Sequence, residues 1–434
     1  MTGVDWVCKK SSPGLLSQYG HALMRWHILI LGLTWNHFVW AQAPTFRLTD
    51  LLQKALTSHP TIYQARDQVS AAGHELDAAK WGRFPALTSE LRSDNQYTQS
   101  VAKLEQPLWA GGRIDGRIDL VQSNVQVAEA GVREAELTAL NQVGFAFFEL
   151  VRLRARQVAA SANVQEHQRL LDLITRPAEA QISPEADVTL ANARWQQARS
   201  EQLQISRQFE STRHNLSQWV GPLEGQPLAP RALAYSRSPM PEATVIAAQS
   251  FSPLRQKLLS QITSAQAQID LAKAQSLPTV VAGYQHVVSG PLFLSPDRGR
   301  AYIGLQYQPG AGLSSLAGLR SAVSRKDAAE RELQTHDMNL QAQVMTLYHE
   351  IDNLNEQISP ALALELATAD LMESTLRQYQ IGRKNWLDVL NSQREKTQAA
   401  YNLADVQSSL LQSQLKLMLL TQDVQTDKAS LIHE

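Results

Sequence analysis

An internal repeat constrains the fold of this chain more strongly than any other feature of its sequence. The segment SHPTIYQARDQVSAAGHELDAAKWGRFPAL corresponds to the later segment FSPLRQKLLSQITSAQAQIDLAKAQSLPTV. Pro60 and Pro85 in the first segment align with Pro253 and Pro278 in the second, and each pair lies 25 residues apart. Because repeated sequences fold into repeated units, the chain is expected to contain two copies of one arrangement of helices and strands.

Two further matches extend the repeat in the same order. QPLWAGG, which begins at Gln106, corresponds to QPGAG, which begins at Gln308. AEAQISPEADVTLANARWQQA contains Asp187 where YQIGRKNWLDVLNSQREKTQA contains Asp388, 201 residues later. These matches predict a first repeat, a proline-rich linker, a second repeat and a C-terminal tail, over 42–222, 223–242, 243–421 and 422–434.

Both repeats have the same predicted order of elements: a helix, a strand hairpin, a very long helix, a turn and a final helix. The first helix of each ends before a proline, which cannot enter a helix interior without loss of a hydrogen bond. In the first repeat we predict hairpin strands within 86–107 and helices over 112–176 and 184–220. In the second we predict a helix over 253–277, hairpin strands within 279–308, a long helix over 316–380 broken at Pro360, and a helix over 385–421.

Heptad spacing indicates how the long helices pack. Apolar residues of the second long helix step alternately by four and three, at Leu340, Val344, Leu347, Ile351, Leu354 and Ile358. The final helix has the same spacing at Leu403, Val406, Leu410, Ser413, Leu417 and Leu420. Two heptad helices joined by a short turn pack as an antiparallel pair. The predicted fold class is therefore mainly α with β and a two-fold internal repeat.

Composition argues against several classes of protein. The formal net charge is −1, so no basic excess favours nucleic acid as a partner. The single cysteine, Cys8, cannot form a disulfide or a cysteine metal site within one chain. His336 and His349 lie 13 residues apart, which is not a metal-site spacing, and no phosphate-binding or nucleophile motif occurs. The sequence thus predicts no metal, no cofactor and no enzymatic activity.

The N-terminus carries a predicted signal peptide over 1–41. An apolar core follows Arg25, and small residues at Val39 and Ala41 fit cleavage after Ala41. Residues 1–23 are either an over-extended start or a long polar region before that core. No later apolar run is long enough to form a spanning helix, so a membrane location would require the strands. Two hairpins leave open edges, and closing them requires further copies of the chain.

Two motifs carry a resemblance to a known family. QPLWAGGRIDGRID after the first hairpin and YQIGRKNWLDVLNSQRE at the second long turn resemble the TolC family of outer membrane channel proteins. The resemblance implies a homotrimer whose chains supply four strands each to a twelve-stranded transmembrane β-barrel in outer membrane lipid. It also implies a long α-helical barrel in the periplasm. The implied partners are a periplasmic adaptor protein and an inner-membrane ABC transporter or proton-driven pump.

The resemblance further implies where such a channel narrows. Asp388 is expected at the pore constriction, and Asn391 stands where the family pattern has a second acidic residue. A tie between neighbouring helical tips is expected to involve Asp187, Tyr379 and Lys384. Lys384 replaces a usual arginine, so a planar two-pronged ion pair gives way to a point charge.

The tip turns and their acids also have simpler explanations. Gly382 is expected to end a helix in a left-handed conformation, while its counterpart Gln181 departs from the usual glycine. Asp187 and Asp388 both lie at a predicted helix start, where the helix dipole stabilises a carboxylate by roughly 0.3–1 kcal/mol. Tyr379 also fits a packing role in the turn.

Three functions are consistent with these sequence features. Type I protein secretion is favoured by the tip sequence GRKNWLDVLNSQRE and by the lack of a lipid-anchored mature cysteine. Small-molecule efflux is the alternative within the same class of channel. A periplasmic coiled-coil scaffold without a pore is a third possibility, which the two predicted hairpins disfavour.

Overall fold

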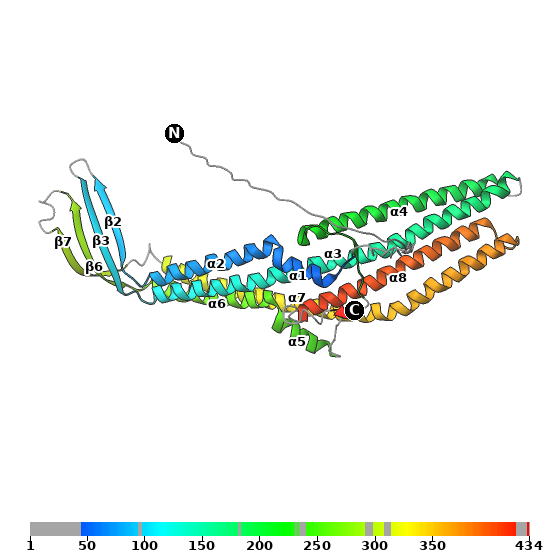
Figure 1. The fold of residues 1–434 in the computed structure, drawn as a ribbon. Coiled ribbons are helices and arrows are strands. Elements are labelled where there is room, and N and C mark those ends of the chain that lie inside the picture. Colours follow the sequence, from blue (N-terminus) through cyan, green and yellow to red (C-terminus); the bar gives the residue numbers. More distant parts are fainter. Residues whose placement is uncertain are drawn as a thin grey trace, which may run out of the picture. The chain divides into compact units, whose positions relative to one another are not determined.

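The first repeat consists of two short helices, a strand pair and two long helices (Figure 1). The computed structural model describes residues 45–93, 98–180, 184–230, 232–233, 240–290, 298–307, 314–421 and 432–433. The predicted signal peptide, Gln181 and most of the predicted tail lie outside the described residues. The elements of this repeat are α1 (Leu48–Ser58), α2 (Pro60–Trp81), β2 (Ala86–Ser93), β3 (Thr98–Trp109), α3 (Arg113–Glu179) and α4 (Glu185–Val220).

The second repeat has the same order of elements. It comprises α5 (Pro241–Phe251), α6 (Pro253–Gln275), β6 (Thr279–Ser289), β7 (Gly299–Gln306), α7 (Ser314–Gln380) and α8 (Trp386–Thr421). The sequence analysis assigned neither α1 nor α5. Each of these two helices is followed directly by the residue that caps the next helix. His59 accepts the Thr61 N–H at 3.3 Å and caps α2, and Ser252 accepts the Arg255 N–H at 3.2 Å and caps α6.

The prediction that Pro360 breaks the second long helix is wrong. Helix α7 runs without interruption from Ser314 to Gln380 and contains Pro360 in its interior. An interior proline costs about 3 kcal/mol, because it removes one hydrogen bond and crowds the preceding turn. Packing on both sides of the proline offsets this local cost, since Ile351 before it and Ala361 and Thr368 after it are buried.

The long helices pack as the heptads predict. Helix α3 lies along α4, and α7 lies along α8, while α3 also contacts α8 and joins the two pairs (Figure 1). In α7 and α8 the heptad residues form one apolar seam, with Leu340, Val344, Leu347, Ile351, Leu410 and Leu417 buried. Towards the strands, α3 contacts α2 and α6, and α6 contacts α7. No helix within the described ranges is both long and apolar enough to cross a membrane.

The strands of both repeats form one antiparallel sheet in the order β2-β3-β6-β7. The central pair, β3 and β6, joins the two repeats across this sheet. Among the described strands, β2 and β7 each pair on one side only, so both outer edges of the sheet are open. Two smaller pairs, β1 (Thr45–Phe46) with β4 (Gln226–Pro227) and β5 (Ala232–Leu233) with β8 (Ile432–His433), tie the linker and the tail to the helices.

Three apolar clusters stabilise the helices. The largest joins α1, α3, α4 and α8 around Phe147 and Phe148, whose rings meet edge to face at 5.5 Å between centroids. A second joins α5, α7 and α8. The third lies at the turns between the long helices, around Trp386, Leu390 and Ile174. The sheet has no comparable core of its own, because its strands are largely exposed.

Candidate functional site

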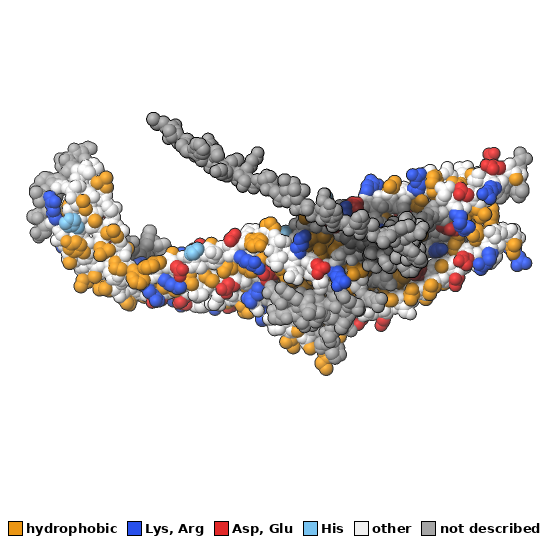
Figure 2. Space-filling view, viewed as in Figure 1, with side chains coloured by type: hydrophobic (Ala, Val, Ile, Leu, Met, Phe, Trp, Pro, Cys, Tyr) orange, Lys and Arg blue, Asp and Glu red, His pale blue; other side chains and the backbone are white. Residues whose placement is uncertain are grey.

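The four-stranded sheet has one apolar face. Residues directly opposite on neighbouring strands share a face, and so do residues two apart along one strand. Leu87 pairs with Leu104, which pairs with Tyr284, so these side chains project from the same side. Leu91, Ile303 and Leu305 share this side by alternation along β2 and β7. Ile303 is 77% exposed and Leu87 is 73% exposed, so no described part of the chain covers this face. Figure 2 shows hydrophobic side chains gathered over the strands.

The opposite face of the sheet is polar. Every lysine, arginine, aspartate and glutamate of the four strands lies on it, namely Glu90, Arg92, Lys103, Glu105 and Arg300. Glu90 accepts from Arg92 at 3.0 Å and lies 3.6 Å from Lys103. The Tyr302 hydroxyl crosses over Gly283 and donates a hydrogen bond to Glu105. A sheet with one exposed apolar face and one charged face separates lipid from water.

The turn between α7 and α8 is fixed by backbone hydrogen bonds. Gly382 has a φ of +74°, which an L side chain rarely adopts. Its N–H donates to the Tyr379 carbonyl at 2.9 Å, and the Arg383 N–H donates to the Gln378 carbonyl at 2.9 Å. This pair of bonds is the Schellman motif, in which a left-handed glycine ends a helix. The helix-ending role expected for Gly382 is therefore what its geometry shows.

Helix α8 begins with a reciprocal cap. The Asp388 N–H donates to the Asn385 side-chain oxygen at 2.8 Å, and the Asn385 N–H donates to the Asp388 carboxylate at 3.3 Å. The first residue of α8 is Trp386, so Asn385 is the N-cap and Asp388 the third helical residue, as in a capping box. The Asn-Trp-Leu-Asp sequence was the available signal for this cap, which the sequence analysis missed.

The corresponding helix start in the first repeat lacks this cap. Pro184 occupies the N-cap position of α4, where Asn385 stands in the second repeat, and it has no side-chain acceptor. Asp187 is half-buried, and its N–H donates to the Pro184 carbonyl at 3.1 Å. No hydrogen bond or ion pair within the described residues engages the Asp187 carboxylate. The two acids are thus equivalent in the repeat but not in their local contacts.

The remaining predicted tip residues lie around the same turn. The Tyr379 ring packs against Trp386 with centroids 5.1 Å apart, and Trp386 is almost fully buried. Lys384 is exposed and Asn391 is half-buried. In the described part of one chain, no contact joins Asp187 to Tyr379 or Lys384. Within one chain, Tyr379 therefore has the packing role, and a tie between tips would have to form between chains.

A buried polar cluster connects α3 to α8 several turns from the tips. Asn163 Oδ1 accepts from Gln393 Nε2 at 3.0 Å and from Thr397 Oγ1 at 2.8 Å. Further along the same seam, Asp405 accepts from Arg152 and Arg156 at 3.1 and 3.0 Å. Sequence reasoning missed both groups, because their partners are more than 200 positions apart and only the packing of α3 on α8 brings them together.

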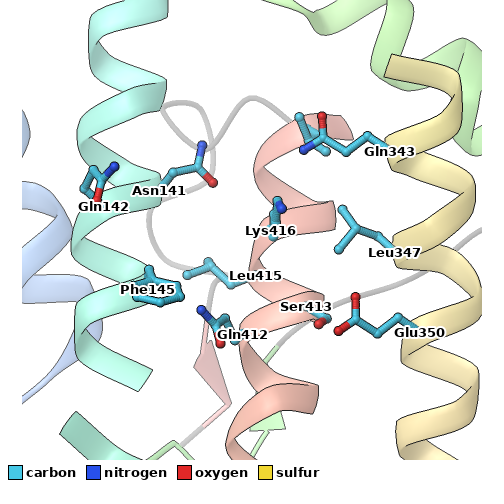
Figure 3. Close-up of a pocket in the computed structure, with 11 residues that line it drawn as sticks. Asn141, Gln142, Phe145, Gln343, Leu347, Glu350, Gln412, Ser413, Leu415 and Lys416 are labelled. Carbon is cyan, nitrogen blue, oxygen red and sulfur yellow. The ribbon is translucent and has the colours of Figure 1, made fainter. Parts of the chain in front are cut away.

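A cavity of about 570 Å³ opens between α3, α7 and α8 near the end of α8 (Figure 3). Figure 3 shows Lys416 and Gln412 on α8, between Phe145 of α3 and Glu350 of α7. Amides, one cation, one carboxylate, a serine hydroxyl, leucines and an aromatic ring line this cavity. Across the described ranges, no group of three or more His, Cys, Asp or Glu side chains is arranged to hold a metal ion.

Solved structures with this fold include several channels. A membrane protein from Pseudomonas aeruginosa is 17% identical, with a TM-score of 0.76 over 86% of this chain and 90% of that one. The outer membrane protein VceC from Vibrio cholerae is 17% identical, with a TM-score of 0.73 over 86% and 96%. The MtrE outer membrane channel of Neisseria gonorrhoeae, solved in its open state, is 14% identical, with a TM-score of 0.68 over 86% and 88%. Comparison with curated proteins gives no match.

The fold and the two-faced sheet together define a class, the outer membrane channel proteins. The model of the outer membrane efflux protein family matches residues 51–222 and 252–421, which are most of both repeats. The chain belongs to the outer membrane efflux protein family, that of the TolC-like channels which its motifs resemble. This result confirms the predicted fold class and the outer membrane location with helices in the periplasm. The family consists of transport channels and not of enzymes.

Proposed function

We propose that three copies of this chain form one export channel through the outer membrane. The observation that carries this proposal is the sheet, which has an exposed apolar face, a charged face and two open edges. Unpaired backbone groups cost several kcal/mol each in lipid, so the β2 edge of one copy must pair with the β7 edge of the next. The apolar face then meets lipid, and the charged face lines the lumen.

The number of copies follows from the size of the lumen. Four strands per chain give eight strands in a dimer and twelve in a trimer. A closed sheet of about eight strands has an interior just wide enough for its own side chains. Three copies are therefore the smallest assembly that leaves an open passage, in agreement with the homotrimer that the family resemblance implies.

The assembly is tested by its mass and by its conductance. The full sequence has a mass of 48.2 kDa, from which the predicted signal peptide is removed, and light scattering in detergent should give about three times the mass of the processed chain for the protein component. The same preparation should carry ion current across a planar lipid bilayer. A monodisperse single chain in the soluble periplasmic fraction would refute the proposal and favour a scaffold without a pore.

The charged tips are proposed to form the gate. Asp388 binds Asn385 through one carboxylate oxygen at the helix start, which leaves its other oxygen free to face a pore. Three such carboxylates would form one ring at the constriction, with Asn391 one turn further along α8 adding no second ring of charge. Asp187, whose carboxylate has no partner in the described residues, is proposed to tie to Lys384 and Tyr379 of a neighbouring copy.

The transport partner is proposed to be an inner-membrane ABC transporter acting through a periplasmic adaptor, as in type I protein secretion. The support is the sequence of the α7–α8 tip, GRKNWLDVLNSQRE, which resembles secretion channels. Small-molecule efflux with a proton-driven pump is the second candidate, which the description of the family as efflux proteins favours. A deletion strain distinguishes them: loss of one large exported protein with unchanged drug sensitivity supports secretion, and the reverse supports efflux.

A further inference from the structure

The charges on the polar face of the sheet do not cancel. The strands place Arg92, Lys103 and Arg300 on this face against two carboxylates, Glu90 and Glu105. Each chain therefore contributes one excess positive charge from its strands. Arg298 directly precedes β7, and its carbonyl accepts from the Val287 N–H at 2.7 Å. Because Val287 belongs to the polar face, the strand register puts Arg298 on that side as well.

Among the charged residues of the four described strands, Arg300 is the cation without a carboxylate partner. Glu90 is engaged by both Arg92 and Lys103, and Glu105 accepts the hydrogen bond from Tyr302. No ion pair or hydrogen bond within the described strands engages the exposed Arg300 guanidinium. Arg300 stands in one row across the sheet with Gln285 and Lys103, so this row carries two cations and no carboxylate.

Assembly cannot remove this excess. Arg300 lies on the edge strand β7, which closure of the sheet would place beside β2 of the next copy. Glu90 is the one carboxylate on the polar face of β2, and it already pairs with Arg92 and Lys103. A bond across the joint would redistribute the pairs, but the three cations and two carboxylates of the described strands of each chain would still face one lumen.

We propose that the sheet end of this channel favours anions, that Arg300 is its main specificity-determining residue, and that the exported substrates carry acidic segments. The proposal rests on the trimeric channel proposed above and deepens it by naming a substrate class. Counted over the described strands, three copies put three excess positive charges around one narrow aqueous passage. Like charges on the walls of such a passage concentrate counter-ions within it. The acidic ring proposed at Asp388 lies at the opposite end of the long helices and acts in the opposite sense.

The test is the reversal potential of the purified full-length protein in a planar bilayer under a KCl gradient. Arg300→Gln should lower the chloride-to-potassium permeability ratio about twofold in dilute salt, where charge acts over roughly 30 Å. Arg300→Glu should lower it further. Arg300→Lys, which keeps the charge, and Tyr302→Phe, which alters the same face without changing charge, should both match the parent. In about 1 M KCl all variants should converge, because screening then limits the charge to roughly 3 Å.

A second measurement addresses the substrate class directly. Short polyglutamate peptide added on the sheet side should block the parent current, and it should block Arg300→Glu several-fold less. Equal ratios for Arg300→Gln and Arg300→Lys, or equal block in parent and Arg300→Glu, would overturn this proposal and leave the channel intact. A parent protein that carries no current at all would overturn both proposals together.

Discussion

Replacement of Asn163 by alanine is expected to weaken the packing of α3 on α8. Asn163 is 7% exposed, and its side-chain oxygen accepts from both Gln393 and Thr397. After the substitution, the two donors keep different hydrogen bonds. Thr397 Oγ1 still lies 3.0 Å from the Gln393 carbonyl, whereas Gln393 Nε2 keeps only a bond of 3.3 Å to Thr397. The cost therefore falls mainly on the Gln393 amide.

The loss of stability in Asn163→Ala can be estimated from the one weaker hydrogen bond that Gln393 keeps. A buried donor left unpaired costs about 1–3 kcal/mol, and the 3% exposed Gln393 retains one weaker bond. With the small cavity left by the truncated side chain, we expect a loss of about 2 kcal/mol of stability per chain. Thr397→Val should cost less, because the Asn163–Gln393 bond survives. Removal of both amides in Asn163→Leu with Gln393→Leu should restore part of the loss, because no donor then remains unpaired.

Two measurements check this order. Thermal unfolding followed by circular dichroism should show a midpoint lowered by about 2–5 °C for Asn163→Ala. Hydrogen exchange should become faster in the α3 and α8 segments that flank the cluster, and not at the α5–α7 contact. The reasoning fails if the double leucine variant is as unstable as Asn163→Ala, or if Thr397→Val is the more damaging change. Either result would mean that shape, and not hydrogen bonding, determines stability at this seam.

Further predictions concern the tips and one buried histidine. Asp388→Ala should leave assembly intact and reduce the block of current by multivalent cations; unchanged block would remove Asp388 from the pore. Neutralising Asp187 and Lys384 together should raise the resting conductance, and a channel as closed as the parent would place the tie elsewhere. Gly382→Ala should destabilise the turn by about 1–2 kcal/mol, measured as faster hydrogen exchange at the end of α7. Burial lowers the pKa of His167 below its ordinary 6.5, so the unfolded chain binds the extra proton first and stability should fall as the pH drops through and below about 6.5. His167→Asn should flatten that pH dependence, and an unchanged profile would exclude His167 as its source.

Much of the helical architecture can be predicted from the sequence, because its signals are local and repeated. Heptads at Leu340 to Ile358 and Leu403 to Leu420 predict the α7–α8 pair, and the structure buries most of these residues in one seam. The error at Pro360 has the opposite cause. The rule that proline ends a helix considers one residue only. In the structure, the remaining hydrogen bonds of the 67-residue helix α7 and its packing against α8 outweigh the local cost of Pro360.

The candidate sites are harder to predict because they depend on contacts between distant segments. Alternation along β7 indicates two faces, but only the register across four strands shows that Arg300 shares a row with Lys103. The repeat makes Asp187 and Asp388 equivalent, yet Pro184 and Asn385 give them different surroundings. The roles proposed for these acids in a gate depend on neighbouring copies, which one sequence does not describe.

The open-edged sheet also bears on how the chain reaches its destination. Its helical pairs are joined by short turns, so they can form early and alone, whereas β3 and β6 are separated by about 170 residues of chain. A completed single chain then presents an apolar sheet face with two open strand edges, which can pair with strands of other unfolded proteins. Aggregation of the single chain is thus most favourable between its export and its assembly with other copies. Holding chaperones and a rapid encounter of copies, more than the stability of any one copy, should determine how much functional protein a cell obtains.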